Sequence, residues 1–205
     1  SHAGASKIKQ VVHAMLPFTG IYYIRKLFDT LLYDLLLWDK WRTKRLLNKV
    51  SAPKGVPLIE RLAILIASPD CQALREELYA RLGHFHLLRY RCFTLANEFA
   101  TPKSVATRLD GHEKKITWQL RRLYRARNLI VHTSRVPAYV STLIENGHDY
   151  LDSVMFEVIK RSCGDYQTVT IAQVFELTAV AYRKKRADIA TSADFGDNRA
   201  LILVS

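Results

Sequence analysis

Apolar residues recur at intervals of three and four positions over long segments that Gly and Pro scarcely interrupt. Within residues 19–49, the residues that show this spacing are Leu27, Phe28, Leu31, Leu35 and Trp38. Such spacing places apolar side chains on one side of an α-helix. The chain of 205 residues has only 8 Gly and 6 Pro, whereas an architecture of strands and turns uses these residues at its turns. The sequence therefore predicts an all-α fold.

Breaks in the helical pattern predict how the chain is divided. The strongest break, at Pro53, Gly55 and Pro57, separates an expected N-terminal helical extension, 1–52, from an expected up-and-down helical bundle, 57–187. The extension is expected to hold one long amphipathic helix, 19–49. Residues 188–205 are expected to form a C-terminal tail, whose apolar end can dock on the core. The helices expected in the bundle span 58–67, 69–82, 86–99, 111–132, 137–161 and 170–186, with turns at Asp110 and Gly111 and at Cys163 and Gly164.

The charge balance predicts a polyanionic partner. Lys and Arg number 31 against 19 Asp and Glu, which gives a formal net charge of +12. The three cysteines, Cys71, Cys92 and Cys163, have no paired spacing, so a reducing, cytoplasmic location is expected. The most apolar stretch, 21–38, is interrupted by four charged residues, so no membrane-spanning helix is expected.

Half of the net charge lies in one predicted helix. Residues 111–135 contain seven Lys or Arg and one acid, Glu113. At about 100° per residue, one side of this helix is apolar and the opposite side is polar and cationic. The apolar side carries Ile116, Leu120, Leu123 and Ile130, and the opposite side carries Arg121, Arg125, Asn128 and His132.

Arg127 interrupts the apolar side of the same helix, between Leu123 and Ile130. A buried, unpaired guanidinium costs several kcal/mol, so this position requires an acidic partner, a polar cleft or a bound anion. Glu145 and Asp149 on the next helix are candidate partners. Arg127 and His132 are about 140° and about 7.5 Å apart on an ideal helix. They can meet if Arg127 swings round, if the helix loosens near Thr133, or if a second subunit contributes.

The segment from Arg127 through Asn128 to His132 has an Arg, a polar residue and a His with four residues between Arg and His. This pattern resembles the motif of the HEPN superfamily of helical ribonucleases and nucleotide-binding proteins. Trp118 and residues 123–128 also resemble the prokaryotic branch found in defence proteins, and the resemblance covers about residues 58–186. It implies a HEPN-type bundle that dimerises so that both motifs face one cleft and cut RNA without metal or cofactor. It also suggests a toxic effector of an antiphage or toxin–antitoxin system, with an antitoxin or a sensor domain as a further partner.

The residue types suit this chemistry. A ribose 2′-hydroxyl can attack the adjacent phosphate when a base removes its proton and an acid protonates the leaving 5′-oxygen, which yields a 2′,3′-cyclic phosphate and a 5′-hydroxyl. His132 suits the proton transfers, because an imidazole group can both accept and donate a proton. Arg127 suits the phosphate oxygens, and Asn128 would orient the ring or the phosphate.

Other side chains of this segment are candidate RNA contacts. Arg121, Arg122, Arg125 and Arg135 would meet phosphates, and Tyr124 would either stack on a base or pack in the core. Two alternatives remain open: a non-catalytic module that binds nucleic acid or a nucleotide, and a dimerisation or adaptor domain that meets an acidic partner. No metal site is expected, because His84 and His86 lack a ligand spacing with cysteines and the Glu145–His148 pair occurs once.

Overall fold

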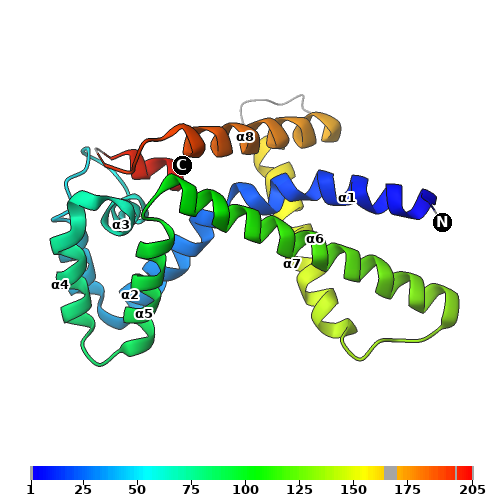
Figure 1. The fold of residues 1–205 in the computed structure, drawn as a ribbon, viewed down its shortest axis with the longest axis horizontal. Helices are drawn as coiled ribbons and strands as arrows, with labels where there is room; N and C mark the ends of the chain where they lie inside the picture. Colours follow the sequence, from blue (N-terminus) through cyan, green and yellow to red (C-terminus); the bar gives the residue numbers. More distant parts are fainter. Residues whose placement is uncertain (1, 164–169, 197, 205) are drawn as a thin grey trace. The chain divides into compact units, whose positions relative to one another are not determined.

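The computed structural model describes residues 2–163, 170–196 and 198–204, which form helices joined by loops and turns, with no strand among them (Figure 1). The prediction of an all-α fold is therefore confirmed. The α-helices are α1 (His2–Ile21), α2 (Tyr23–Leu47), α3 (Leu58–Ala67), α4 (Gln72–Leu82), α5 (His86–Glu98), α6 (Pro102–Thr133), α7 (Val140–Ser162) and α8 (Ile171–Thr191). Short 3₁₀ helices, η1 (Pro69–Cys71) and η2 (Arg199–Leu203), complete the description.

Two units make up the chain, and each contains two separate stretches of sequence. Unit 1 comprises residues 1–21 and 109–184, and unit 2 comprises residues 22–108 and 185–205. This division differs from the expected one, in which 1–52 formed an extension, 57–187 a bundle and 188–205 a tail. The break at 53–57 lies inside unit 2, where it links α2 to α3.

Unit 1 has a core in which α1 packs with α6 and α7. Val12, Ile116, Leu120 and Tyr150 are buried together, and Leu123 packs against them. Ile116 and Leu120 thus take the inward positions that the helical pattern predicts. The Tyr150 hydroxyl donates a hydrogen bond to the Gln119 side chain, whose amide donates to the Asn146 side chain over 3.2 Å. Burial, with the nearby Asp149 carboxylate, raises the pKa of Tyr150 to about 12.

Unit 1 also holds a close approach between α1 and α8. A Cβ atom at Gly20 would lie 2.6 Å from the Tyr182 ring, so only glycine fits there without a shift. The Tyr182 hydroxyl donates to the Glu113 carboxylate over 2.7 Å. Gly20 therefore lets Tyr182 reach across and tie α8 to α6.

Unit 2 is built around α3, most of whose side chains are buried. Phe28, Leu31 and Leu35 of α2 are buried in the same unit. The last turn, η2, packs on α3 and buries Leu203 and Val204. The expected tail is thus part of unit 2, because burial of its apolar end stabilises the docked position.

Several helix boundaries differ from the predicted ones, most of all in α6, α2 and α8. α6 runs without a break through Asp110 and Gly111, where a turn was expected, because Leu109 and Ile116 on either side are buried on the helix's inner face. The predicted helix 19–49 begins instead at Tyr23, and it kinks at Asp39, whose φ and ψ are −153° and 95°. α8 continues to Thr191. The expected cap at Gly164 lies outside the described residues.

No helix in the described part of the chain combines the length and the apolar character that a membrane span requires.

Candidate nucleic-acid interface

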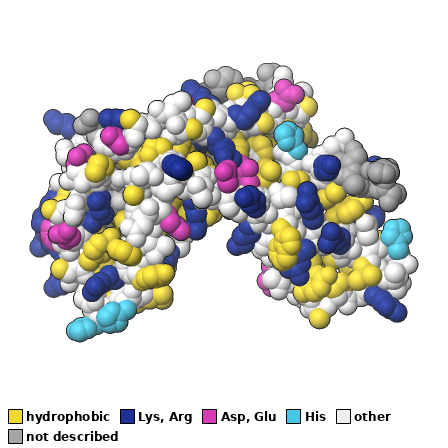
Figure 2. Space-filling model, in the orientation of Figure 1, with side chains coloured by type: hydrophobic (Ala, Val, Ile, Leu, Met, Phe, Trp, Pro, Cys, Tyr) yellow, Lys and Arg dark blue, Asp and Glu magenta, His cyan; other side chains and the backbone are white. Residues whose placement is uncertain are grey.

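The solvent-facing side of α6 in unit 1 carries cations around an exposed tryptophan. At about 100° per residue, every member of this group lies within about 60° of Trp118 around the helix. All of them are exposed or half-buried, and Lys and Arg side chains lie beside exposed hydrophobic ones over α6 in Figure 2. We call this group the basic face; it consists of Lys114, Lys115, Trp118, Arg121, Arg122, Arg125 and His132.

The amphipathic pattern of α6 explains why the basic face is turned outward. Ile116, Leu120 and Leu123 lie about 140° to 160° round the helix from Trp118, and they pack against α1 and α7. Burial of that side fixes the rotation of α6 about its axis. The cations therefore stand together on the solvent-facing side of α6 and contribute to one positive surface.

Arg122 is held between two aromatic rings. Its guanidinium carbon lies 4.5 Å from the centre of the Trp118 ring and 4.5 Å from the centre of the Tyr139 ring. Trp118 is one helical turn before Arg122, and Tyr139 is the residue that precedes α7. Such cation–π contacts contribute about 0.5–1 kcal/mol each at exposed sites. We call these three residues the aromatic stack; both of its rings are exposed, Trp118 at 58% and Tyr139 at 46%.

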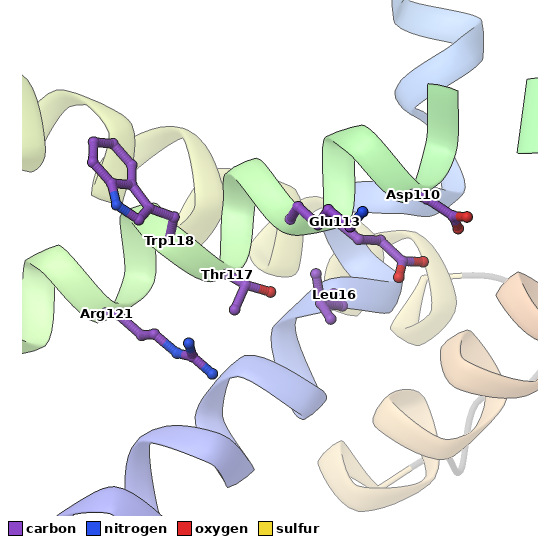
Figure 3. Close-up of a pocket in the computed structure, with 7 residues that line it drawn as sticks. Leu16, Asp110, Glu113, Thr117, Trp118 and Arg121 are labelled. Atoms are coloured by element: carbon purple, nitrogen blue, oxygen red, sulfur yellow. The ribbon is translucent and has the colours of Figure 1, made fainter. Parts of the chain in front are cut away.

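A pocket of about 400 Å³ lies beside the basic face, between α1 and α6. Arg121 and Asp110 lie at opposite ends of it, with Thr117 and Leu16 between them (Figure 3). Glu113 makes the Asp110 end acidic. Lys114 also lines the pocket, but it is outnumbered by these two acids, so a polyanion is favoured at the Arg121 end, which adjoins the basic face.

Arg127 is exposed, and the expectation of a buried guanidinium on the apolar side of the helix is wrong. Leu123 packs against the unit 1 core and Ala126 is still buried, whereas Arg127 and the α6 residues after it are exposed or half-buried. Its guanidinium donates to the Asn128 side chain over 3.2 Å. Within the described residues it makes no ion pair with Glu145 or Asp149.

His132 is also exposed, in the last turn of α6. The helix continues to Thr133, and Ser134 then leaves it with a φ of 53°. Because the backbone between them stays helical, Arg127 and His132 point about 140° apart. The sequence left three ways for Arg127 and His132 to meet. The helix does not loosen before Thr133, and the Arg127 side chain turns only as far as Asn128, so neither of the first two ways brings them together within one copy of the chain. Asn128 is half-buried.

The remaining predicted RNA contacts are placed differently from one another. Arg121 and Arg125 are exposed on the basic face, and Arg122 belongs to the aromatic stack. Arg135 is exposed beyond the end of α6, and Tyr124 is half-buried and about 120° from Trp118. The charge pattern of the sequence assigned no binding role to Trp118, Tyr139, Lys114 or Lys115. The contact between Trp118 and Arg122 could have been predicted from their spacing, since residues four apart are neighbours on a helix.

Potential metal ligands do not gather in the described residues, where no three His, Cys, Asp or Glu side chains are placed to hold an ion. Cys71 and Cys92 are buried free thiols, and Cys163 is exposed.

Comparison of the chain with protein-family models, curated proteins and solved structures finds no match.

Proposed function

We propose that this chain binds RNA through the basic face of α6. The observation that carries this proposal is the alignment of five Lys and Arg side chains on one solvent-facing side of a single helix, around an exposed tryptophan. Phosphate contacts by Lys and Arg release the counterions of the nucleic acid, and this release dominates affinity. Ile116 and Leu120, buried on the opposite side of α6, fix the rotation of the helix and therefore the direction in which the cations point.

The test is the salt dependence of RNA affinity. If all five cations meet phosphates of a single strand, the slope of log affinity against log salt is about −3.5, since each contact contributes about −0.7. Arg125→Gln is then expected to reduce the slope by about 0.7. Arg89→Gln is the matched control, because Arg89 is exposed on α5 of unit 2 and is not part of the basic face, so this change should leave the slope unchanged. Equal effects of the two substitutions would contradict binding through the basic face.

A second candidate function is metal-independent RNA cleavage of the HEPN type, in the role of a toxic effector in prokaryotic defence. His132 shares a side of α6 with the basic face, so RNA bound there would pass the imidazole. Arg127 lies on the other side of that helix, so one copy of the chain does not bring the two groups together. Cleavage then requires a homodimer, in which Arg127 of one copy stabilises the phosphate and His132 of the other moves the protons.

Self-association has support in an exposed apolar stripe on α7. Its members fall on one side of the helix and are each about half exposed: Ile144, Leu151, Met155 and Ile159. Acids flank the first half of the stripe, at Glu145, Asp149 and Asp152, and Lys160 and Arg161 follow its end. Two copies of α7 packed antiparallel would bring acidic and basic halves together while burying the stripe.

Incubation of purified protein with RNA in EDTA tests the second candidate. We expect cyclic-phosphate ends, activity that depends on protein concentration in the range where dimers dissociate, and loss of cleavage in both Arg127→Ala and His132→Ala. A mixture of the two variants should regain part of the activity, because a mixed dimer keeps one intact Arg127 and one intact His132. Cleavage that persists in both single variants would refute the assignment, and binding without cleavage would leave RNA binding as the function.

A further inference from the structure

The aromatic stack lies in the middle of the basic face. Cations stand one turn before Trp118 at Lys114 and Lys115, one turn after it at Arg121 and Arg122, and a further turn on at Arg125. Side chains one turn apart on a helix are neighbours, about 5–6 Å apart at Cβ. Any chain of phosphates held by these cations would therefore pass directly beside the indole ring.

Trp118 is a large apolar ring that remains 58% exposed. Trp118 is one of the residues that line the pocket, and in the close-up of Figure 3 its ring extends to the other side of α6 from Thr117 and Leu16. Arg122 covers one part of the ring at 4.5 Å and is itself backed by Tyr139. The ring is thus held in place by its neighbours while much of its surface stays accessible, which is the arrangement of a preorganised stacking platform.

We propose that Trp118 stacks on an unpaired base, so that the basic face selects single-stranded over duplex RNA. This inference rests on the proposed RNA-binding function and adds the class of substrate. Phosphate contacts alone do not distinguish the two forms by their bases, because phosphates are exposed in both. Stacking does, since bases inside a duplex already stack on each other and offer no free face to a protein ring.

The alternative role of the stack is structural: Tyr139 and Arg122 would fasten the segment between α6 and α7 to the helix. A structural role predicts that Trp118 substitutions lower thermal stability without a specific effect on single strands. A stacking role predicts that an aromatic replacement, Trp118→Phe, retains most of the affinity that Trp118→Ala loses.

The experiment measures affinity by fluorescence anisotropy at one fixed salt concentration, with the full chain and three probes of about 12 nucleotides. The probes are a labelled oligouridine, the same strand annealed to oligoadenosine, and an abasic strand of equal charge. We expect the wild type to bind oligouridine at least about ten-fold more tightly than the abasic strand, and Trp118→Ala to lose about ten-fold or more on oligouridine alone. Trp41→Ala is the matched control, because Trp41 is a 74% exposed tryptophan of unit 2 and is not part of the basic face.

A direct signal comes from the ring itself. In Trp38→Phe/Trp41→Phe, Trp118 is the remaining tryptophan, and its fluorescence should be quenched by oligouridine and not by the abasic strand. If the wild type binds the three probes alike and Trp118→Ala changes nothing, single-strand selection by Trp118 is refuted while RNA binding stands. If the wild type binds none of them, the proposed function fails as well.

Discussion

Lys185 provides a test of the structure that is independent of any ligand. It lies on α8 in unit 2, where burial and, more weakly, the positive charge of Arg25 lower the pKa of its ammonium group to about 8 from an ordinary value of 10.5. The folded chain therefore binds this proton less tightly than the unfolded chain does. The free energy of unfolding contributed by Lys185 accordingly rises as the pH increases from about 8 towards 10.5.

The size of the effect follows from these two pKa values. Between about pH 7.5 and about pH 9.5 the linkage relation gives Lys185 a gain of about 2 kcal/mol in the free energy of unfolding. Buried thiols act in the opposite direction over the same range. Burial raises the pKa of Cys92 to about 12 and also raises that of Cys71, so these thiols ionise first in the unfolded chain. The informative quantity is therefore the difference in pH dependence between the wild type and Lys185→Met.

Urea unfolding followed by circular dichroism, at about pH 7.5, 8.5 and 9.5, measures this difference. The wild type should gain about 2 kcal/mol relative to Lys185→Met across the range. Lys184→Met is the control, because Lys184 is exposed and should retain the wild-type pH dependence. Parallel curves for the wild type and Lys185→Met would show that the ammonium group of Lys185 is not buried as described.

Three further stability measurements test unit 1. Gly20→Ala places a Cβ atom 2.6 Å from the Tyr182 ring and should lower the free energy of unfolding by about 1–3 kcal/mol. If this Cβ atom displaces the ring, the hydroxyl of Tyr182 no longer contributes, so adding Tyr182→Phe to Gly20→Ala should cause no further loss of stability. Leu120→Ala empties part of the buried cluster and should cost about 2–5 kcal/mol in urea unfolding; a loss well below this range would contradict its burial. Tyr150 has a pKa raised to about 12, so the wild type should lose stability as the pH rises above about 10, and Tyr150→Phe should reduce that alkaline loss.

The spacing of apolar residues along the sequence was sufficient to predict one helix and the buried side of another. The helix expected at 58–67 is α3 with the same bounds, and the inward side of α6 at Ile116 and Leu120 follows from their spacing. The turn expected at Asp110 and Gly111 was wrong, because a local turn signal was outweighed by burial on both sides of it.

The candidate site was only partly predictable, since its missing parts depend on tertiary structure. The cations of the basic face are evident from composition and spacing. The exposure of Arg127 depends on where the unit 1 core ends along α6, and the helical pattern itself continues past that point. Tyr139 joins Trp118 and Arg122 only after the chain has turned at Ser134 and Pro137, so the aromatic stack has no signature in the sequence of α6 alone.

The order in which the chain is synthesised gives the division into units a consequence for folding. The first stretch of unit 1 ends at residue 21 and the second begins at residue 109, so 87 residues (22–108) separate α1 from its partners. The length-dependent part of the entropic cost of closing such a loop is about 4 kcal/mol. The burial of Val12 beside Leu120 and Tyr150 must stabilise unit 1 by more than this cost. Unit 2 likewise lacks residues 185–205 until residues 109–184 have been synthesised. Each unit therefore completes its core only after the segment between its two stretches has been made, and the apolar side of α1 stays exposed until α6 and α7 have formed.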